Sequence, residues 1–352
     1  MSGTDESMQQ ILDDILVEHS DGAKLMDFSL NEEVRTMVKS KLADVLLERL
    51  KSRVLSNLEA SREIEKEFED AVLITWRKPL ELLDLLLNMC LEVSTGFISE
   101  SGDGGSSKRT YVQRALARQQ ANACLVFNEI LHLLKNGFPS GAQSHWRTLH
   151  EIACISYFIS KNGEDVAKRF LDYEVVEDYF QAEALSEHQQ KMGCTSLSKS
   201  DLKTIEKDLA AIEKIYGDDF VKKSNYPYGW IPREVMKTRS FKEIEKSVGL
   251  DSFRPYYDLA GYNLHGGQNG LIFKLGIIKN KKKRVIIPVG PSNYGLSEPG
   301  KSAAISIGQV TACRLLSESG VKRLVIVEAL RNLVDEICDA FSEIEAEFAK
   351  ND

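Results

Sequence analysis

The chain has 352 residues, enough for one large domain or two of ordinary size, and its 43% hydrophobic and 28% charged residues are typical of a globular protein. Its net charge of −8 excludes a protein that coats nucleic acid or an anionic membrane with its whole surface, so nucleic acid could be bound only at a local basic site. The N-terminal sequence MSGTDESMQQILDDI lacks the basic segment of a signal peptide, and no apolar run is long enough to span a bilayer. We therefore expect a cytoplasmic protein that does not enter a membrane.

Helical periodicity begins in the N-terminal part of the chain. Apolar residues recur every three or four positions through residues 31–58, and Pro79 fits the first turn of a further helix. The glycine- and serine-rich stretch SESGDGGSSKR, residues 99–109, predicts a flexible loop. We therefore predict an N-terminal helical arm over residues 1–100 and a separate domain over residues 108–352. The amphipathic helices of the arm could serve a homodimer as well as a core.

The second domain is predicted to be an antiparallel helical bundle. Residues 110–162 form a helical hairpin around the turn FPSG, and further amphipathic helices follow. Only LIFKLGII and RVIIPV have the composition of β-strands, and they flank the basic sequence KNKKKR. The predicted fold class is therefore mainly α, with one inserted β-hairpin near residues 271–289. We interpret its basic tip, residues 279–284, as a solvated turn rather than a phosphate site.

Residues 295–302 of the sequence GLSEPGKSAA match the phosphate-loop pattern G-x-x-x-x-G-K-[ST]. A phosphate loop must follow a buried strand directly and surround the phosphates with backbone N–H groups. Here PSNY separates the candidate strand from Gly295, and Pro299 removes one N–H from the loop. We interpret the match as a turn followed by the start of a helix, and keep nucleotide binding there as an alternative.

The helical sequence SHWRTLHEIAC carries four polar or reactive side chains on one face: Arg147, His150, Glu151 and Cys154. Arg147 precedes Glu151 by four residues in a largely apolar helix, and buried charges need partners. The pattern therefore predicts an interior polar network rather than surface decoration. His150 and Cys154 lack the second histidine of a zincin, and the six cysteines of the chain form no C-x-x-C pair. We therefore predict buried free thiols, no metal site and no cofactor.

A second polar face lies in the sequence YYDLAGYNLHGG, where Asp258, Gly261, Tyr262 and His265 share one side of a short helix. Gly261 lowers the stability of a helix, so we expect a bulky group to approach the helix at this position. An earlier amphipathic helix adds Tyr173, a polar side chain among apolar neighbours.

Two interpretations of these faces stay open. In the functional interpretation, six side chains converge on a polar pocket between helices: Arg147, Glu151, Tyr173, Asp258, Tyr262 and His265. Arg147 would hold an anionic group there, and His265 would carry a proton. In the other interpretation, the same residues form a satisfied network that ties the helices together.

Two motifs carry a resemblance to a known family. LLKNGFPSGAQSHWRTLHEIACISYFI fits a helical hairpin of the form L-x-x-G-x-x-x-x-A-x-x-x-x-R-x-x-x-E, and YYDLAGYNLHGG fits a Y-x-x-L-[SA]-x-x-x-H helix with one extra residue before the histidine. Over residues 111–270 the chain resembles an uncharacterised bacterial helical family, a domain of unknown function. The resemblance implies a helical domain that carries Arg147, Glu151 and His265, and it implies no established activity.

In its helical character and its bacterial setting, this family is also similar to the HEPN proteins of toxin and phage-defence systems. Those ribonucleases place an Arg four to six residues from a His, whereas Arg147 and His150 are closer together. We therefore predict a stress- or defence-associated binding or accessory protein. The alternative is an RNase-like enzyme that cleaves phosphodiesters, with Arg147 stabilising phosphate and His265 as general acid or base. In the enzyme, His265 should be accessible and should face Arg147 across a cleft.

Overall fold

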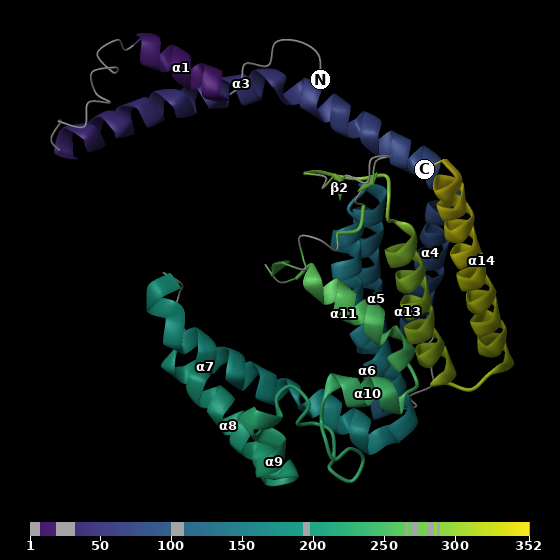
Figure 1. Ribbon diagram of the computed structural model, residues 1–352. Helices are drawn as coiled ribbons and strands as arrows, with labels where there is room; N and C mark the ends of the chain where they lie inside the picture. The colour runs from purple at the N-terminus through teal and green to yellow at the C-terminus, as the bar shows by residue number, and fades with distance from the viewer. Residues whose placement is uncertain are drawn as a thin grey trace. The chain divides into compact units, whose positions relative to one another are not determined.

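The chain divides into two compact units, Met1–Asp70 and Ala71–Asp352, each of which is described by itself (Figure 1). The computed structural model describes residues 8–18, 32–99, 109–192, 198–264, 267–268, 270, 274–276, 278–279, 285–286 and 289–351. Within these residues, no helix is both long and apolar enough to cross a membrane.

The first unit contains helix α1, Met8–Glu18, and most of helix α3, Glu32–Thr75. Ile11 and Ile15 of α1 are buried and lie one helical turn apart, so α1 has one apolar face. Arg49 of α3 forms an ion pair with the last residue of α1.

Helix α3 also carries apolar side chains that this unit leaves exposed, among them Leu47, Val54 and Leu55. Leu47 and Val54 are seven residues apart and therefore lie on the same side of the helix. The homodimer predicted through the N-terminal helices stays a prediction, and this side of α3 is its candidate contact.

The second unit is built around a bundle of long helices that lie side by side (Figure 1). They are α4, Arg77–Ser99; α5, Tyr111–Lys135; α6, Pro139–Asp172; α13, Ser297–Leu316; and α14, Val321–Asn351. Helix α13 contacts each of the other four. The predicted mainly helical fold class is confirmed.

Local sequence explains why α5 and α6 form an antiparallel hairpin. Thr110 caps α5, because its hydroxyl accepts the Gln113 N–H while the Gln113 side-chain oxygen accepts the Thr110 N–H. Gly137 follows α5 with a φ of 72°, a conformation that glycine adopts without strain. Pro139 then opens α6 at a position where its missing N–H costs no helical hydrogen bond. Trp146 of α6 fixes the bundle from inside, since it is fully buried and donates to Ser306 Oγ of α13 at 3.0 Å.

Shorter elements complete the second unit. They are α7, Glu174–Met192; α8, Lys199–Tyr216; α9, Asp218–Val221; α10, Phe241–Ser247; α11, Arg254–Tyr262; and the 3-10 turns η1, Lys223–Asn225, and η2, Asp251–Phe253. Helices α10 and α11 both pack against α6.

The compact units divide after Asp70, and the domain boundary predicted near residue 100 stays a prediction. Helix α4 was predicted to belong to the arm, yet it packs against α5, α13 and α14. Its inward residues Leu83, Leu86 and Cys90 are fully buried, so α4 supplies part of the bundle core. Residues 100–108 of the predicted flexible loop lie outside the described residues.

The inserted β-hairpin predicted near residues 271–289 is not supported beyond one short pairing. In the described part of that range, β1, Ile278–Lys279, pairs antiparallel with β2, Val285–Ile286. The first predicted strand is interrupted by a turn at Leu275 and Gly276, where Gly276 has a φ of 83° that an extended strand cannot continue through. Much of the remaining range lies outside the described residues.

The structure contradicts the alternative of nucleotide binding at residues 295–302. From Ser297 onward these residues form the first turns of α13, and the Gly300 N–H already donates to the Leu296 carbonyl at 3.1 Å. A Cβ at Gly300 would lie 2.3 Å from Cζ of Phe341, so the glycine is needed for the close approach of α13 to α14. The residues that match the phosphate-loop pattern therefore form the start of α13, and Gly300 among them allows α13 to approach α14 closely. This agrees with the interpretation of the match as a turn followed by the start of a helix.

Candidate functional site

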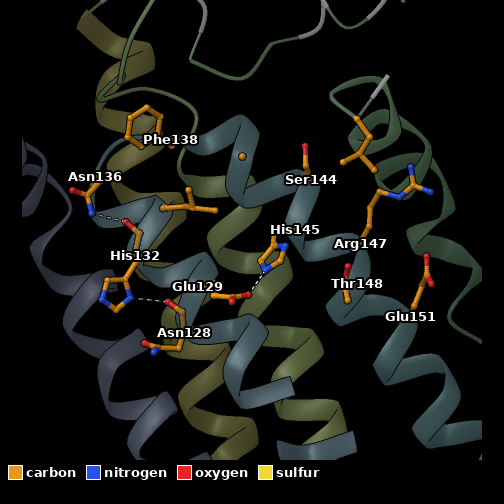
Figure 2. Close-up of a pocket in the computed structure, with 13 residues that line it drawn as sticks. Asn128, Glu129, His132, Asn136, Phe138, Ser144, His145, Arg147, Thr148 and Glu151 are labelled. Atoms are coloured by element: carbon orange, nitrogen blue, oxygen red, sulfur yellow. Dashed lines mark hydrogen bonds and ion pairs between the residues drawn. The ribbon is translucent and has the colours of Figure 1, made fainter. Parts of the chain in front are cut away.

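A pocket of about 790 Å³ lies along the α5–α6 hairpin (Figure 2). Helix α5 lines it with Asn128, Glu129, His132, Leu133 and Asn136, which are spaced by one, three or four residues and so share one side of the helix. Helix α6 contributes Gly141, Ser144, His145, Arg147, Thr148 and Glu151, and Leu264 after α11 adds an apolar side chain. We refer to this cavity as the α5–α6 pocket.

Two side chains face each other across the pocket. His145 of α6 points toward Glu129 of α5 and forms a short hydrogen bond through Nε2 (Figure 2). Both side chains are partly exposed, so the pair is accessible from the pocket. His132 also lines the pocket, and its Nδ1 contacts the backbone carbonyl of Asn128 at 2.9 Å.

Arg147 lies at the end of the pocket nearest α11. Its guanidinium carbon is 4.0 Å from the centre of the Tyr257 ring, a cation–π contact. A Cβ at Gly261 would lie 2.4 Å from Arg147 Nη1, so the arginine is the bulky group that we expected to approach α11 at this glycine. The expectation from the sequence that something approaches Gly261 is therefore confirmed.

Arg147 and Glu151 do not form the ion pair that the sequence suggested. Tyr257 joins them instead, because its hydroxyl donates a short hydrogen bond to Glu151 while its ring supports Arg147. Burial and the hydrogen bond to Glu151 raise the pKa of Tyr257 to about 12, so the phenol keeps its proton and acts as the donor. Among the described residues, no carboxylate forms an ion pair with Arg147.

A second cluster lies on the inward side of α6, and we call it the inner network: His150, Glu245 of α10 and Arg254 of α11. His150 Nε2 lies 2.9 Å from Glu245 Oε1, and the other oxygen of Glu245 forms an ion pair with Arg254. The His150 and Glu245 side chains are 1% and 0% exposed.

Aromatic rings surround the histidine of the inner network. The ring centres of Trp146, Phe253, Phe241 and Tyr257 lie 5.2, 5.5, 5.9 and 6.0 Å from that of His150. Burial lowers the pKa of His150, and the hydrogen bond to Glu245 opposes this only in part. A neutral imidazole with its proton on Nε2 fits the geometry, because it donates to Glu245 while the buried Nδ1 has no hydrogen-bond donor or acceptor.

Cys154 belongs to the same interior. Its Sγ lies 3.6 Å from His150 Nε2, and burial, reinforced by the negative charge of Glu245, raises the pKa of the thiol well above its usual range. A thiol held in its neutral form is a poor nucleophile and a poor metal ligand. Within the described residues, no group of three His, Cys, Asp or Glu side chains is arranged to hold a metal ion.

The other side chains assigned to the pocket from the sequence lie elsewhere. Asp258 is on the exposed side of α11, 3.6 Å from Arg254, and Tyr262 lies partly exposed near the end of that helix. Tyr173 joins α6 to α7 and is buried against Phe220, with ring centres 5.1 Å apart, in a different part of the unit. His265 lies outside the described residues, so its predicted position opposite Arg147 is not tested.

Several residues of these sites were not identified from the sequence, among them Glu129, His145, Glu245 and Tyr257. His145 stood two residues before Arg147 in the same motif, and Tyr257 stood in the second motif, so both were within reach of the sequence argument. Glu245 belongs to a short charged helix that carries no distinctive pattern, and only the fold brings it to His150.

The domain that holds both sites matches a known family model. Residues 113–283 match the family of unknown function DUF5677. The DUF5677 match runs from the first turn of α5 past α11, so it contains the α5–α6 pocket and the inner network. This confirms the resemblance to an uncharacterised helical family, and it adds nothing in favour of the HEPN analogy. No curated protein and no solved structure matches the chain.

Proposed function

We propose that the protein is a binding or accessory protein whose α5–α6 pocket holds an anionic group of a small ligand through Arg147. Pockets of several hundred cubic ångströms suit small-molecule ligands, and the polar side chains here converge from two adjoining helices. The resemblance of the sequence to bacterial helical families supports a place in stress response or phage defence. The match to a family without an assigned activity supports no reaction.

The proposal rests on the position of Arg147 and on the lack of a carboxylate paired with it among the described residues. Its guanidinium is held over the Tyr257 ring at 4.0 Å and occupies the space that Gly261 leaves open, so its position is fixed before a ligand arrives. Its positive charge has no carboxylate partner in the described residues, because Glu151 accepts the Tyr257 hydroxyl instead. A positioned and partly buried guanidinium favours a carboxylate or phosphate group.

A second candidate is the phosphodiester-cleaving enzyme, in which Arg147 stabilises phosphate and His265 acts as general acid or base. One observation favours keeping it: the histidines His132 and His145 line the same pocket as Arg147. Either of them could carry a proton in place of His265.

The first test is thermal unfolding of the wild type, Arg147→Ala and His265→Ala. Loss of one cation–π contact costs about 0.5–1 kcal/mol, so we expect Arg147→Ala to unfold no more than about 3 °C below the wild type. A loss of many degrees in both variants would show that these residues serve the fold rather than a ligand.

The second test is a screen of small carboxylates and phosphates by ligand-observed NMR. We expect ligands that bind the wild type to be lost with Arg147→Gln and retained with Arg118→Gln, an exposed arginine paired with Glu174 outside the pocket. Equal binding to both variants contradicts the proposal. Cleavage of labelled RNA by the wild type but not by His265→Ala would favour the enzyme instead.

A further inference from the structure

The α5–α6 pocket carries a negative charge as well as the positive charge of Arg147. We propose that its ligand is a small amphipathic zwitterion of the amino-acid class: an anionic group meets Arg147, an ammonium group meets Glu129, and an apolar body lies over Leu133 and Phe138. This inference rests on the proposed function, because it takes Arg147 as the site of the anionic group.

Glu129 supplies the negative charge. Its partner among the described residues is His145 Nε2, and 48% of its side chain is exposed. The hydrogen bond with His145 uses one acceptor site of the Glu129 carboxylate, and further acceptor sites remain for other donors. Glu129 can therefore accept hydrogen bonds from an ammonium group in the pocket while His145 holds it in position.

The two charges lie in different parts of the pocket. Figure 2 shows Arg147 at the side near α11, the pair of Glu129 and His145 in the middle, and Phe138 on the side away from Arg147. A simple anion would be attracted by Arg147 and repelled by Glu129, and a simple cation would meet the reverse. A ligand with both charges satisfies both side chains, because its anionic group meets Arg147 while its ammonium group meets Glu129.

The apolar part of the lining completes the pattern. Phe138 and Leu264 are 44% and 56% exposed, and both contribute to the pocket together with Leu133. Exposed apolar side chains inside a concave site mark the place where the apolar part of a ligand is removed from water. Charged groups in the middle and at one end, with Leu133 and Phe138 together at the other, match an amino acid with a large apolar side chain.

The experiment titrates the full-length protein at pH 8 with four matched probes, followed by NMR or calorimetry. L-phenylalanine carries both charges and a ring, 3-phenylpropionate lacks the ammonium, 2-phenylethylamine lacks the carboxylate, and glycine lacks the ring. We expect phenylalanine to bind at least tenfold more tightly than each of the other three. Glu129→Gln should bring phenylalanine down to the affinity of phenylpropionate without weakening phenylpropionate.

Controls and outcomes separate this inference from the proposed function. Glu174→Gln, which removes an exposed carboxylate outside the pocket, should leave all four affinities unchanged. If phenylpropionate binds as tightly as phenylalanine and both depend on Arg147, the zwitterion is wrong and the anion site stands. If phenylethylamine binds best and Arg147→Gln has no effect on any probe, both proposals fail. Absence of binding by all four probes overturns the zwitterion.

Discussion

The two polar clusters of the second unit stand on the same helix and differ mainly in their access to water. His145 and Arg147 of α6 line an accessible pocket, whereas His150, one turn further along, is sealed within aromatic rings. Both histidines contact a glutamate through Nε2. In the inner network that glutamate is fully buried and also paired with Arg254, while in the pocket it stays exposed and retains room for a ligand.

The difference shows how burial assigns roles to the same residue types. A buried carboxylate must find its partners within the fold, because an unpaired buried charge costs several kcal/mol. An exposed carboxylate is solvated by water and contributes little to stability, so it can exchange that water for a ligand. The inner network therefore supports the fold, whereas the side chains of the α5–α6 pocket are accessible to a ligand.

The largest expected effect comes from Glu245. Glu245→Gln removes the fully buried carboxylate and leaves the half-buried guanidinium of Arg254 without its closest counter-charge, so we expect a loss of about 3 kcal/mol in the free energy of unfolding. Asp258→Asn is the matched control, since Asp258 pairs with the same arginine from an exposed position and should cost less than about 1 kcal/mol. Urea denaturation measures both. If both variants lose the same free energy of unfolding, the buried Glu245 does not stabilise the fold more than the exposed Asp258 does.

The two histidines provide the next comparison. His150→Ala removes a buried ring from an aromatic cluster and deprives Glu245 of a donor, which should cost about 2 kcal/mol or more. His145→Ala removes an exposed partner of Glu129 and should change the free energy of unfolding by no more than about 0.5 kcal/mol. If His145→Ala lowers the free energy of unfolding by much more than this, the hydrogen bond between Glu129 and His145 also stabilises the fold.

The stability of the protein should also depend on pH through the buried His150. Because burial lowers the pKa of His150, the unfolded chain takes up a proton near its ordinary pKa of about 6.5 while the folded chain does not. Stability due to this group is therefore complete above about pH 6.5 and falls as the pH decreases, by at most about 1.4 kcal/mol per pH unit. Urea midpoints at pH 7.5 and 5.5 should fall less in His150→Gln than in the wild type. An unchanged pH dependence in this variant would falsify the neutral buried imidazole.

The smallest effect concerns the contact between α6 and α11. In an Arg147→Ala background, Gly261→Ala should stabilise the protein by about 0.5–1 kcal/mol, because alanine favours the helix and nothing opposes its methyl group. In the wild type the methyl group displaces the guanidinium from Tyr257, and the gain should be absent. A double-mutant cycle of the free energies of unfolding measures this coupling. Equal effects in both backgrounds would show that Arg147 does not occupy the space at Gly261.

Part of the site could be predicted because it depends on spacing along one helix. Arg147 and Glu151 share a side of α6 by helical geometry alone, as do His150 and Cys154, and the sequence correctly indicated that a bulky group meets Gly261. Helical spacing could not show whether Tyr173 and Asp258 reach the same pocket, and the structure places both outside it. Each lies on another element, and one is buried near Phe220 while the other is exposed on α11.

The boundary and the phosphate-loop match illustrate the same limit. The loop at residues 99–109 is visible in the sequence as a composition, but whether it separates units depends on where the preceding helix packs, and α4 packs into the bundle. Residues 295–302 match the phosphate-loop pattern in residue type, but Gly300 faces Phe341 of another helix. Local composition does not specify the partner of a segment.

The sequence by itself determined the helices, the hairpin of α5 and α6 and the polar face of α6, because propensity, capping and periodicity act between residues close along the chain. Only the tertiary structure decided that Tyr257 contacts both Arg147 and Glu151, that Glu245 reaches His150, and that Glu129 faces His145. These contacts join residues 16 to 106 positions apart in the chain. Their geometry follows from how the helices pack, and packing depends on the whole set of buried side chains rather than on any one segment.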